Sequence, residues 1–499
     1  MLIRDIPRWL FTLALLASLS AAEPAHAEEA GVEPLASPRL AALARDVEAG
    51  HRDAMDAFWR QVQGKAPLVE PVHREPRSRR VTFLWRGDAN VTSVALLGGG
   101  ATAGIAKPMA RLADTDLWYL TETHPSRARF EYFFLVNEPS ADPRNVSELM
   151  RAMERGQPRP DLLNPKEFAG RSYVELPDAP PQPWIVRKPG APVGRLTQRT
   201  FQSRALKAEY PLSVYTPPGY DKRRDRCWLL VAFDGGFPMM EVTLDNLIAA
   251  GKIPPVVVVG VNNVSQDARN RDLSGSAAYA AFLKNELAPW ARKTYRVYPD
   301  APHTIVGGVS LGGFMAAYCG LKQSSVFGNV LALSPTLVLA PGQAQPNDVW
   351  DEEPSGLLPR QFAAAPRQPV RFYLEAGRYE HFYPVSLISQ ARRLRDVLQA
   401  KGYDIAYAEF VGGHNAVCWR GAFANGMMAL TRTKSPRAKA AWNARDALSV
   451  KLGSCYDGRL AAVFRGAARR RVESAGKACL APTRQALPST DRWSATPNS

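Results

Sequence analysis

Cysteine and long apolar runs are both scarce in this chain. Five cysteines occur among 499 residues, and their spacing matches no zinc or haem motif. Beyond residue 30, no apolar stretch is long enough to cross a bilayer as a helix, and no internal repeat is found. We therefore expect an ordinary globular protein without a catalytic metal or cofactor, and the composition, 46% hydrophobic and 22% charged, agrees with a globular fold.

The first apolar run belongs to a predicted export signal. A short charged start is followed by an apolar stretch from Trp9 to Leu19, and small-residue cleavage sites end at Ala22 or Ala27. The run is too short and wrongly flanked for a membrane span, with an uncleaved anchor as the alternative. We expect residues 1–27 to be removed and the mature protein to be periplasmic or secreted.

An oxidising compartment constrains the five cysteines, because an odd number leaves at least one unpaired. Cys455 and Cys479 both lie near the C-terminus and are the pair we would choose for a disulfide. Cys319 follows a serine-containing glycine cluster in an apolar helical stretch, so we expect it to be a small buried side chain.

Charge is strongly unbalanced. The chain carries 63 Lys and Arg against 47 Asp and Glu, a net charge of +16. Such a balance suits anionic ligands or surfaces. The pairing of basic patches with stacking aromatics that is typical of nucleic-acid binding is not evident, so we expect no nucleic-acid partner.

The pattern before residue 195 predicts a small β domain. Ser37 and Pro38 form a cap and first-turn pair for a helical stretch that breaks near Gly50. Short segments rich in β-branched and aromatic residues follow between about 79 and 137, which is typical of antiparallel strands in a sandwich. We predict a helix plus β-sandwich domain over 36–175 and a proline-rich linker over 176–194.

Beyond the linker, continuous apolar runs alternate with helical stretches. This pattern is typical of buried parallel strands and predicts an α/β doubly wound domain over 195–434. The strand candidates are 228–236, 254–262, 303–310, 328–335 and 370–377. Residues 435–499 form a basic, Ala- and Arg-rich extension to which we assign no role.

Ser310 is the candidate nucleophile. It lies in Gly308-Val309-Ser310-Leu311-Gly312, a G-x-S-x-G match between a predicted strand and a predicted helix. In one interpretation, the serine lies on a sharp strand-to-helix turn that exposes its hydroxyl for attack on a substrate. In the alternative interpretation, the motif is only a glycine-rich turn that packs the helix on the strand. A serine hydroxyl needs a base, so a histidine and an orienting carboxylate must lie elsewhere.

Chain order in strand-turn-helix hydrolases, serine then acid then histidine, limits the search. Only His381 and His414 follow Ser310. His414 comes in a Gly-Gly-His-Asn loop directly after the strand-like segment IAYAEF, whereas His381 precedes this final strand, so we choose His414 as the base. The acid should follow the strand ending near 377. We favour Glu380 on loop geometry, while Glu375, still at the strand end, stays an alternative.

Acyl transfer also needs two hydrogen-bond donors for the developing oxyanion. The backbone N–H of Leu311, which follows the nucleophile, supplies one of them. The second should come from the Asp234-Gly235-Gly236-Phe237 loop after the strand 228–236, and we choose Gly236.

In order and spacing, these segments resemble the enterochelin esterase family. The resemblance is carried by AFDGGF, RNRDLSGSAAYAAFLKNELAPW, GGVSLGG, LEAGRYE and GGHNAVCWR, and by FWRQVQGKAPLVEP, VTFLWRGD, DTDLWYLT, ARFEYFF and DLLNP nearer the N-terminus. It spans about residues 40–432. It implies an esterase D-like α/β-hydrolase domain preceded by an immunoglobulin-like β-sandwich domain.

That resemblance implies a serine esterase that hydrolyses a siderophore such as ferric enterochelin through an acyl-enzyme, in the service of iron acquisition. Ser310, Glu380 and His414 would be the triad, and Arg269 and Trp419 would lie near an anionic substrate. Three features depart from the family: GGHN replaces the usual GGHD, an export signal is present, and the extension after 435 has no recognised counterpart.

Two other functions stay open on sequence alone. A carbohydrate esterase, either a feruloyl or an acetyl esterase, also joins a β-sandwich to an esterase D-like domain. A catalytically silent protein that binds a siderophore or glycan is the alternative from a different class. The natural ester and the oligomeric state cannot be inferred.

Overall fold

The computed structural model describes residues 35–98, 106–137, 158–337, 357–382 and 385–432. These residues all belong to one compact unit that ends at Arg432. The predicted signal at 1–27 and the extension at 435–499, with Cys455 and Cys479, lie outside the described residues.

Two short helices open the described chain. In α1 (Pro38–Glu48), the Ser37 hydroxyl accepts a hydrogen bond from the Leu40 N–H, so Ser37 caps the helix as the sequence predicts. The chain turns at Gly50, with φ of 77°, before α2 (Ala54–Val62). Apolar side chains of both helices, such as Leu40 and Trp59, pack on Leu84 and Leu117 of the following strands.

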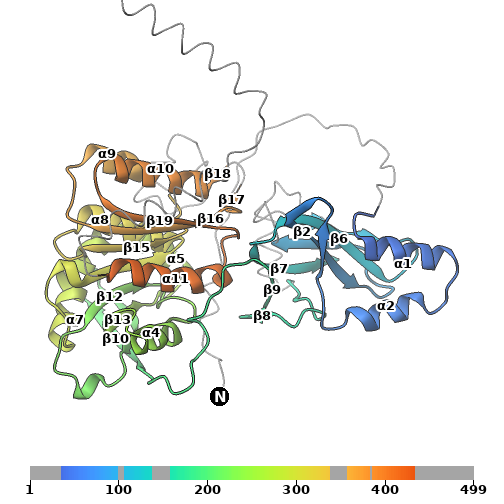
Figure 1. The fold of residues 1–499 in the computed structure, drawn as a ribbon. Helices are drawn as coiled ribbons and strands as arrows, with labels where there is room; N and C mark the ends of the chain where they lie inside the picture. The colour runs from blue at the N-terminus through green and yellow to red at the C-terminus, as the bar shows by residue number, and fades with distance from the viewer. Residues whose placement is uncertain (1–34, 99–105, 138–157, 338–356, 383–384, 433–499) are drawn as a thin grey trace, which may run out of the picture. The chain divides into compact units, whose positions relative to one another are not determined.

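The described residues between 68 and 175, here called the two-sheet region, form two antiparallel sheets (Figure 1). One sheet has the order β1-β2-β6-β5 and the other β4-β3-β7-β9-β8. Aromatic and branched side chains from β2, β3, β7 and β9 fill the core between them. The strands are β1 (Leu68–Val72), β2 (Glu75–Arg86), β3 (Val94–Gly98), β4 (Lys107–Pro108), β5 (Ala110–Arg111), β6 (Leu117–Pro125), β7 (Arg129–Val136), β8 (Glu167–Phe168) and β9 (Arg171–Glu175).

The second half is built on an eight-stranded sheet of order β10-β11-β13-β12-β14-β15-β16-β19, parallel from β13 to β19. Each of the five predicted strands is present, and β12 to β15 are buried along nearly their whole length, as strands covered on both faces should be. The strands are β10 (Arg195–Ser203), β11 (Ala208–Thr216), β12 (Trp228–Phe233), β13 (Val256–Val261), β14 (Thr304–Val309), β15 (Asn329–Leu333), β16 (Arg371–Gly377) and β19 (Asp404–Phe410).

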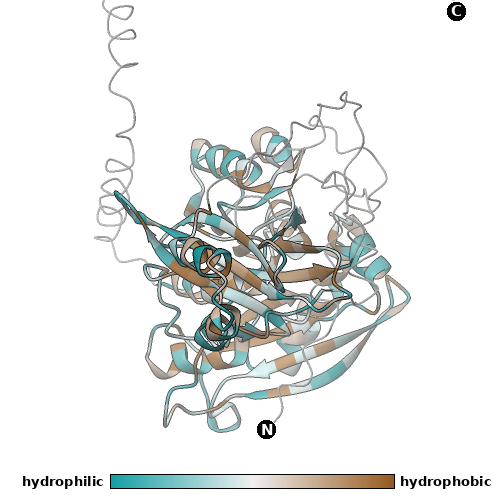
Figure 2. Cartoon of the chain, turned by 90° about the vertical axis from the view of Figure 1, so that its right-hand side faces the viewer, coloured by the Kyte–Doolittle hydropathy of each residue, from teal (hydrophilic) through white to brown (hydrophobic). Residues whose placement is uncertain are grey.

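Helices cover both faces of this sheet. Buried residues of α4 (Met240–Ala249) and α11 (Ala416–Leu430) form one core cluster with the sheet, and buried residues of the helices from α5 to α10 form the other. In Figure 2 the strands carry brown, hydrophobic stretches beside teal ones, and the helices also carry both colours. The other elements are η2 (Tyr220–Lys222), α5 (Gln266–Leu273), α6 (Ala277–Phe282), the π-helical turn η3 (Leu283–Leu287), α7 (Ala288–Thr294), η4 (Ala301–His303), α8 (Leu311–Lys322), α9 (Leu357–Ala364), the small hairpin β17 (His381–Phe382) and β18 (Val385–Ser386), and α10 (Leu387–Ala400).

Two hairpins were not predicted: the small one of β17 and β18, and that of β10 and β11, which extends the main sheet with antiparallel strands. β10 is exposed along nearly its whole length and β11 mixes buried with exposed residues, so neither has the continuous apolar run of the parallel strands. The described residues contain no helix of the length and apolarity that a bilayer crossing requires.

Candidate active site

Ser310 lies on a sharp bend between β14 and α8. Its backbone has φ of 56° and ψ of −123°, a conformation that non-glycine residues rarely adopt. Backbone strain of this kind persists only where the surroundings impose it, and it is typical of the nucleophile position in α/β-hydrolases. The Ser310 hydroxyl lies 3.2 Å from the Thr336 hydroxyl.

A close approach explains the glycines around this serine. A Cβ atom at Gly308 would lie 2.7 Å from the carbonyl carbon of Gly312, so the start of α8 can pack directly on the end of β14. The Ser310 N–H donates to Leu333 O at 3.0 Å, which ties the bend to the end of β15. The close packing of α8 on β14 and the hydrogen bond to β15 therefore hold the Ser310 backbone in its strained conformation.

The structure brings His414 and Glu380 together. Glu380 follows β16 and His414 follows β19, and the carboxyl ends of parallel strands meet at one edge of the sheet, where Ser310 also lies. His414 Nδ1 is 3.4 Å from Glu380 Oε2, and both side chains are almost completely buried. This is the contact that a carboxylate needs in order to orient an imidazole and stabilise its protonated form.

One side chain and one backbone amide hold the Glu380 carboxylate. Its Oε1 accepts hydrogen bonds from the Ser334 hydroxyl at 2.5 Å and from the Gly377 N–H at 2.9 Å. The Trp419 indole N–H in turn donates to the Ser334 hydroxyl at 2.9 Å, and the Trp419 ring meets the His414 ring edge-on, with centroids 4.8 Å apart. Ser334 is fully buried with φ of 45°, and nothing in its sequence context pointed to this role.

The Gly236 prediction needs correction. The Gly236 N–H donates to Phe233 O at 3.0 Å, so a local turn already uses the amide that was expected to face the oxyanion. Gly236 has φ of 135°, and its place in the loop is explained by this turn and by the nearby Met240 side chain. Leu311 is the first residue of α8, where backbone N–H groups have no partner within the helix.

Both halves of the chain match known esterases. Residues 203–430 match the family model described as "Putative esterase", and residues 80–185 match the model described as "Enterochelin esterase, N-terminal". The iron(III) salmochelin esterase of Escherichia coli O6:H1 is 27% identical over 410 residues, which cover 78% of this chain and 96% of that protein. The iron(III) enterobactin esterase of Dickeya dadantii is also 27% identical, with 81% and 99% covered.

A solved structure agrees with these matches. The enterobactin esterase of Shigella flexneri, crystallised in the presence of enterobactin, superimposes with a TM-score of 0.61 at 26% identity, covering 75% of this chain and 97% of that one. The chain belongs to the enterochelin esterase family. It is an esterase of the α/β-hydrolase fold with an additional N-terminal region, as the sequence predicts.

Arg269, which the family resemblance places near substrate, makes a buried ion pair in this family member. Its guanidinium donates to both carboxylate oxygens of Asp234, at 2.8 and 3.0 Å, and Asn263 Nδ2 donates to the same carboxylate at 2.7 Å. Asp234 has φ of 56° and begins the Asp-Gly-Gly loop. Arg269 therefore holds the loop that follows β12.

Trp419 lies behind the histidine. It is 4% exposed, and its polar atom is bonded to Ser334. Its ring packs against the His414 ring, so the structure gives Trp419 a supporting position for His414.

Glu375, the alternative acid, has a different hydrogen-bond partner. It accepts a hydrogen bond from the Tyr373 hydroxyl, and these two side chains lie on the α11 side of β16. Burial, with a smaller contribution from the neighbouring Glu380 carboxylate, raises the pKa of the Glu375 carboxyl to about 7, although the hydrogen bond from Tyr373 acts in the opposite direction. Of the two candidate acids, Glu380 is the one that makes the close contact with His414.

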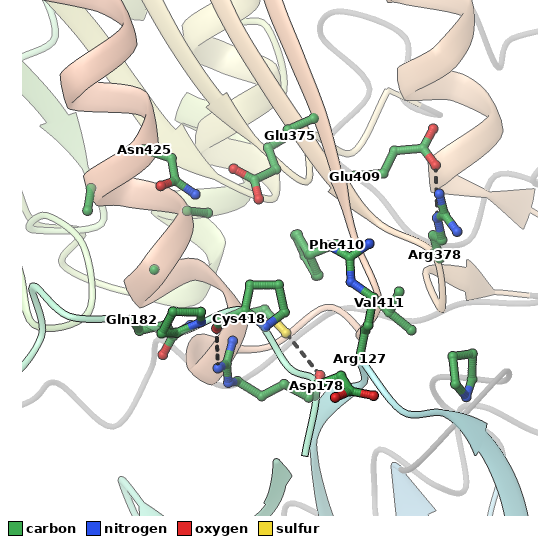
Figure 3. Close-up of a pocket in the computed structure, with 18 of the residues that line it drawn as sticks. Arg127, Asp178, Gln182, Glu375, Arg378, Glu409, Phe410, Val411, Cys418 and Asn425 are labelled. Carbon is green, nitrogen blue, oxygen red and sulfur yellow. Dashed lines mark hydrogen bonds and ion pairs between the residues drawn. The ribbon is translucent and has the colours of Figure 1, made fainter. Parts of the chain in front are cut away.

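Glu375 also lines a cavity of about 740 Å³ (Figure 3). The cavity is bounded by the beginning of β7, the segment 180–185 and the exposed edges of α11 and β19. Figure 3 shows Glu375 and Asn425 near each other on its wall, with Arg127 and Asp178 on the side of the two-sheet region. Ser310, Glu380 and His414 are not among its lining residues.

The described cysteines take no part in the site chemistry. Cys227, Cys319 and Cys418 are buried free thiols, and Cys319 is completely buried as expected. Burial raises the pKa of the Cys418 thiol well above its ordinary value, so this thiol stays protonated at neutral pH.

Proposed function

We propose that this esterase hydrolyses the ester bonds of a ferric siderophore of the enterobactin type. The observation that carries the proposal is the buried contact between His414 Nδ1 and Glu380 Oε2 at the sheet edge that carries Ser310. The relatives that align with this chain over nearly their whole length are named iron(III) salmochelin esterase and iron(III) enterobactin esterase. Such a chelate is anionic, and the chain has a net charge of +16.

In the proposed mechanism, His414 takes the proton from the Ser310 hydroxyl as the oxygen attacks the ester carbonyl. Glu380 orients His414 and stabilises the imidazolium. The imidazolium then protonates the departing alcohol, which leaves an acyl group on Ser310. Water, deprotonated by His414, attacks this acyl group and releases the carboxylic acid.

The oxyanion of each tetrahedral intermediate needs donors that are already in place. The Leu311 N–H at the start of α8 is the first, favoured also by the positive end of the helix dipole. Because Gly236 is committed to Phe233, we assign the second donor to the next amide of the same loop, that of Phe237. Arg269 and Asp234 fix this loop.

The cellular setting is part of the proposal. We propose that residues 1–27 direct export, so that the enzyme meets its substrate outside the cytoplasm as a periplasmic or secreted protein. The partner is then a small anionic ester that carries its own iron, and the proposed chemistry uses neither a resident metal nor nucleic acid.

A product assay tests the substrate. Purified protein is incubated separately with ferric enterobactin and with a feruloylated sugar, and the products are followed by mass, with Ser310→Ala as the inactive control. The proposal expects linear and monomeric acyl-serine products from ferric enterobactin and far slower release of ferulate. Faster release of ferulate would contradict it, and turnover of neither substrate by a folded enzyme would also do so.

A further inference from the structure

The two-sheet region contacts the loops that carry both His414 and Glu380. The Arg129 N–H, at the start of β7, donates to Val411 O at 2.9 Å, three residues before His414. The Cys418 thiol, near the start of α11, donates to Arg129 O at 3.3 Å. A single residue of β7 therefore bonds to the chain on both sides of His414.

Glu131, two residues along the same strand, holds the beginning of α11. Its Oε1 accepts a hydrogen bond from the Val417 N–H at 3.1 Å. Glu131 is 6% exposed and lies 3.9 Å from the Arg171 guanidinium. A carboxylate at a helix N-terminus satisfies N–H groups that the helix leaves unpaired and interacts favourably with the helix dipole.

Tyr379 anchors the loop of the acid. It directly precedes Glu380, yet its ring is buried in the core of the two-sheet region, with Phe130 at a centroid distance of 6.2 Å. The Tyr379 hydroxyl lies 3.4 Å from His124 Nδ1. The Tyr379 N–H donates to Gly412 O at 3.0 Å, which joins the acid loop to the histidine loop.

Space at this junction is tight. A Cβ atom at Gly412 would lie 2.3 Å from Arg129 O and 2.6 Å from the Cys418 sulfur. The backbones of the two halves are thus in direct contact next to His414, and a displacement of β7 must move Gly412 or open the contact.

We propose that the two-sheet region positions the catalytic pair, through Tyr379 for Glu380 and through Glu131 for His414. This inference rests on the proposed roles of these two residues and adds a task for the N-terminal half of the chain. Neither Tyr379 nor Glu131 touches the reacting atoms, so both are positioning residues. A misplacement of about 1 Å at a catalytic group can lower a rate about a hundredfold, which makes such support measurable.

The test compares paired substitutions. Tyr379→Ala removes the anchor and Tyr379→Phe keeps its ring, while Glu131→Ala removes the acceptor and Glu131→Gln keeps an amide oxygen for the Val417 N–H. We expect kcat for a p-nitrophenyl ester to fall about tenfold to a hundredfold in the two alanine variants, with KM changed less than about threefold. The conservative variants should keep most of the rate.

Val94→Ala is the matched control, because Val94 is 2% exposed in the same core but lies on β3, which pairs with β4 and β7 and not with either loop. Thermal unfolding is recorded for every variant, and the rate of fluorophosphonate labelling reports the reactivity of Ser310 independently of ester binding. The proposal expects slow labelling in the alanine variants and wild-type labelling in Val94→Ala.

Two results would overturn the inference. Folded Tyr379→Ala and Glu131→Ala with wild-type kcat and labelling would show that the contacts do not position the pair. An equal loss in Val94→Ala would assign the effect to general destabilisation. Ser310→Ala separates this inference from the proposed function, since wild-type turnover in that variant would refute the serine mechanism itself.

Discussion

Ser334 and Glu380 form the hydrogen bond that fixes the proposed catalytic acid, with 2.5 Å between the serine hydroxyl and Glu380 Oε1. Ser334 is fully buried, and its hydroxyl also accepts from the Trp419 indole. The carboxylate oxygen that does not face His414 is thereby held by a neutral donor. This leaves Oε2 free to orient the imidazole.

Removing that hydroxyl should slow the reaction. A hydrogen bond to a charged group contributes about 1.5–3 kcal/mol, so Ser334→Ala is expected to lower kcat by about tenfold to a hundredfold with little change in KM. Ser324→Ala, which removes a hydroxyl beyond the C-terminal end of α8 that donates to Gln368 Oε1 at 2.7 Å, is the control. Steady-state kinetics on a p-nitrophenyl ester measure both variants. Equal kcat values for the two variants would show that the Ser334 hydroxyl does not support Glu380 in catalysis.

Glu375 should affect stability and leave catalysis nearly unchanged. Its pKa of about 7 exceeds the ordinary 4.5, so the folded protein binds more protons than the unfolded chain between these pH values, and its contribution to stability declines as pH rises through this window. At pH 8 the burial of the charged form costs up to about 3 kcal/mol. Glu375→Gln should therefore raise the free energy of unfolding at pH 8 more than at pH 5.

Denaturant unfolding at the two pH values measures this difference, and ester turnover is recorded alongside. Loss of nearly all activity in a stable Glu375→Gln variant would instead make Glu375 the catalytic acid. An unchanged pH dependence of stability would contradict the raised pKa.

The ion pair between Arg269 and Asp234 should influence kcat more than substrate affinity. Both side chains are nearly buried, and loss of one partner of such a pair costs about 3–5 kcal/mol because it leaves an uncompensated charge. Arg269→Ala is expected to lower the melting temperature and to reduce kcat through the displaced loop. A raised KM with unchanged kcat and stability would indicate a direct substrate contact instead.

Gly412 gives a prediction on packing. Gly412→Ala places a methyl group 2.3 Å from Arg129 O, whereas the nearest atom for a methyl group at Gly413 is Asn415 Nδ2 at 3.4 Å. Overpacking of this kind costs about 1–3 kcal/mol. We expect Gly412→Ala to be less stable than Gly413→Ala by that amount in denaturant unfolding, and equal stabilities would mean that the contact with β7 relaxes freely.

The main sheet could be predicted because its strands have a simple sequence pattern. Strands such as β12 and β13 are buried on both faces and therefore read as continuous apolar runs. The β10 and β11 hairpin was missed because β10 is the edge strand, with exposed polar residues such as Arg195 and Gln198, and because β11 mixes buried with exposed residues.

The site was partly predictable for a similar reason. The bend at Ser310 requires glycines close by in sequence, so it has a local signature. The support of Glu380 by Ser334 and Trp419 joins residues 46 and 85 positions apart, and no local pattern records it. Gly236 was chosen as a donor from its place in a glycine pair, but its amide direction depends on the turn with Phe233.

Covalent labelling of the nucleophile tests the central claim most directly. The mature protein is treated with a fluorophosphonate, digested and mapped by mass, with Ser310→Ala and His414→Ala treated in parallel. The account predicts one modified serine, Ser310, no adduct in Ser310→Ala and labelling slowed by orders of magnitude in His414→Ala. An adduct on another serine, or full labelling and turnover in either variant, would contradict it.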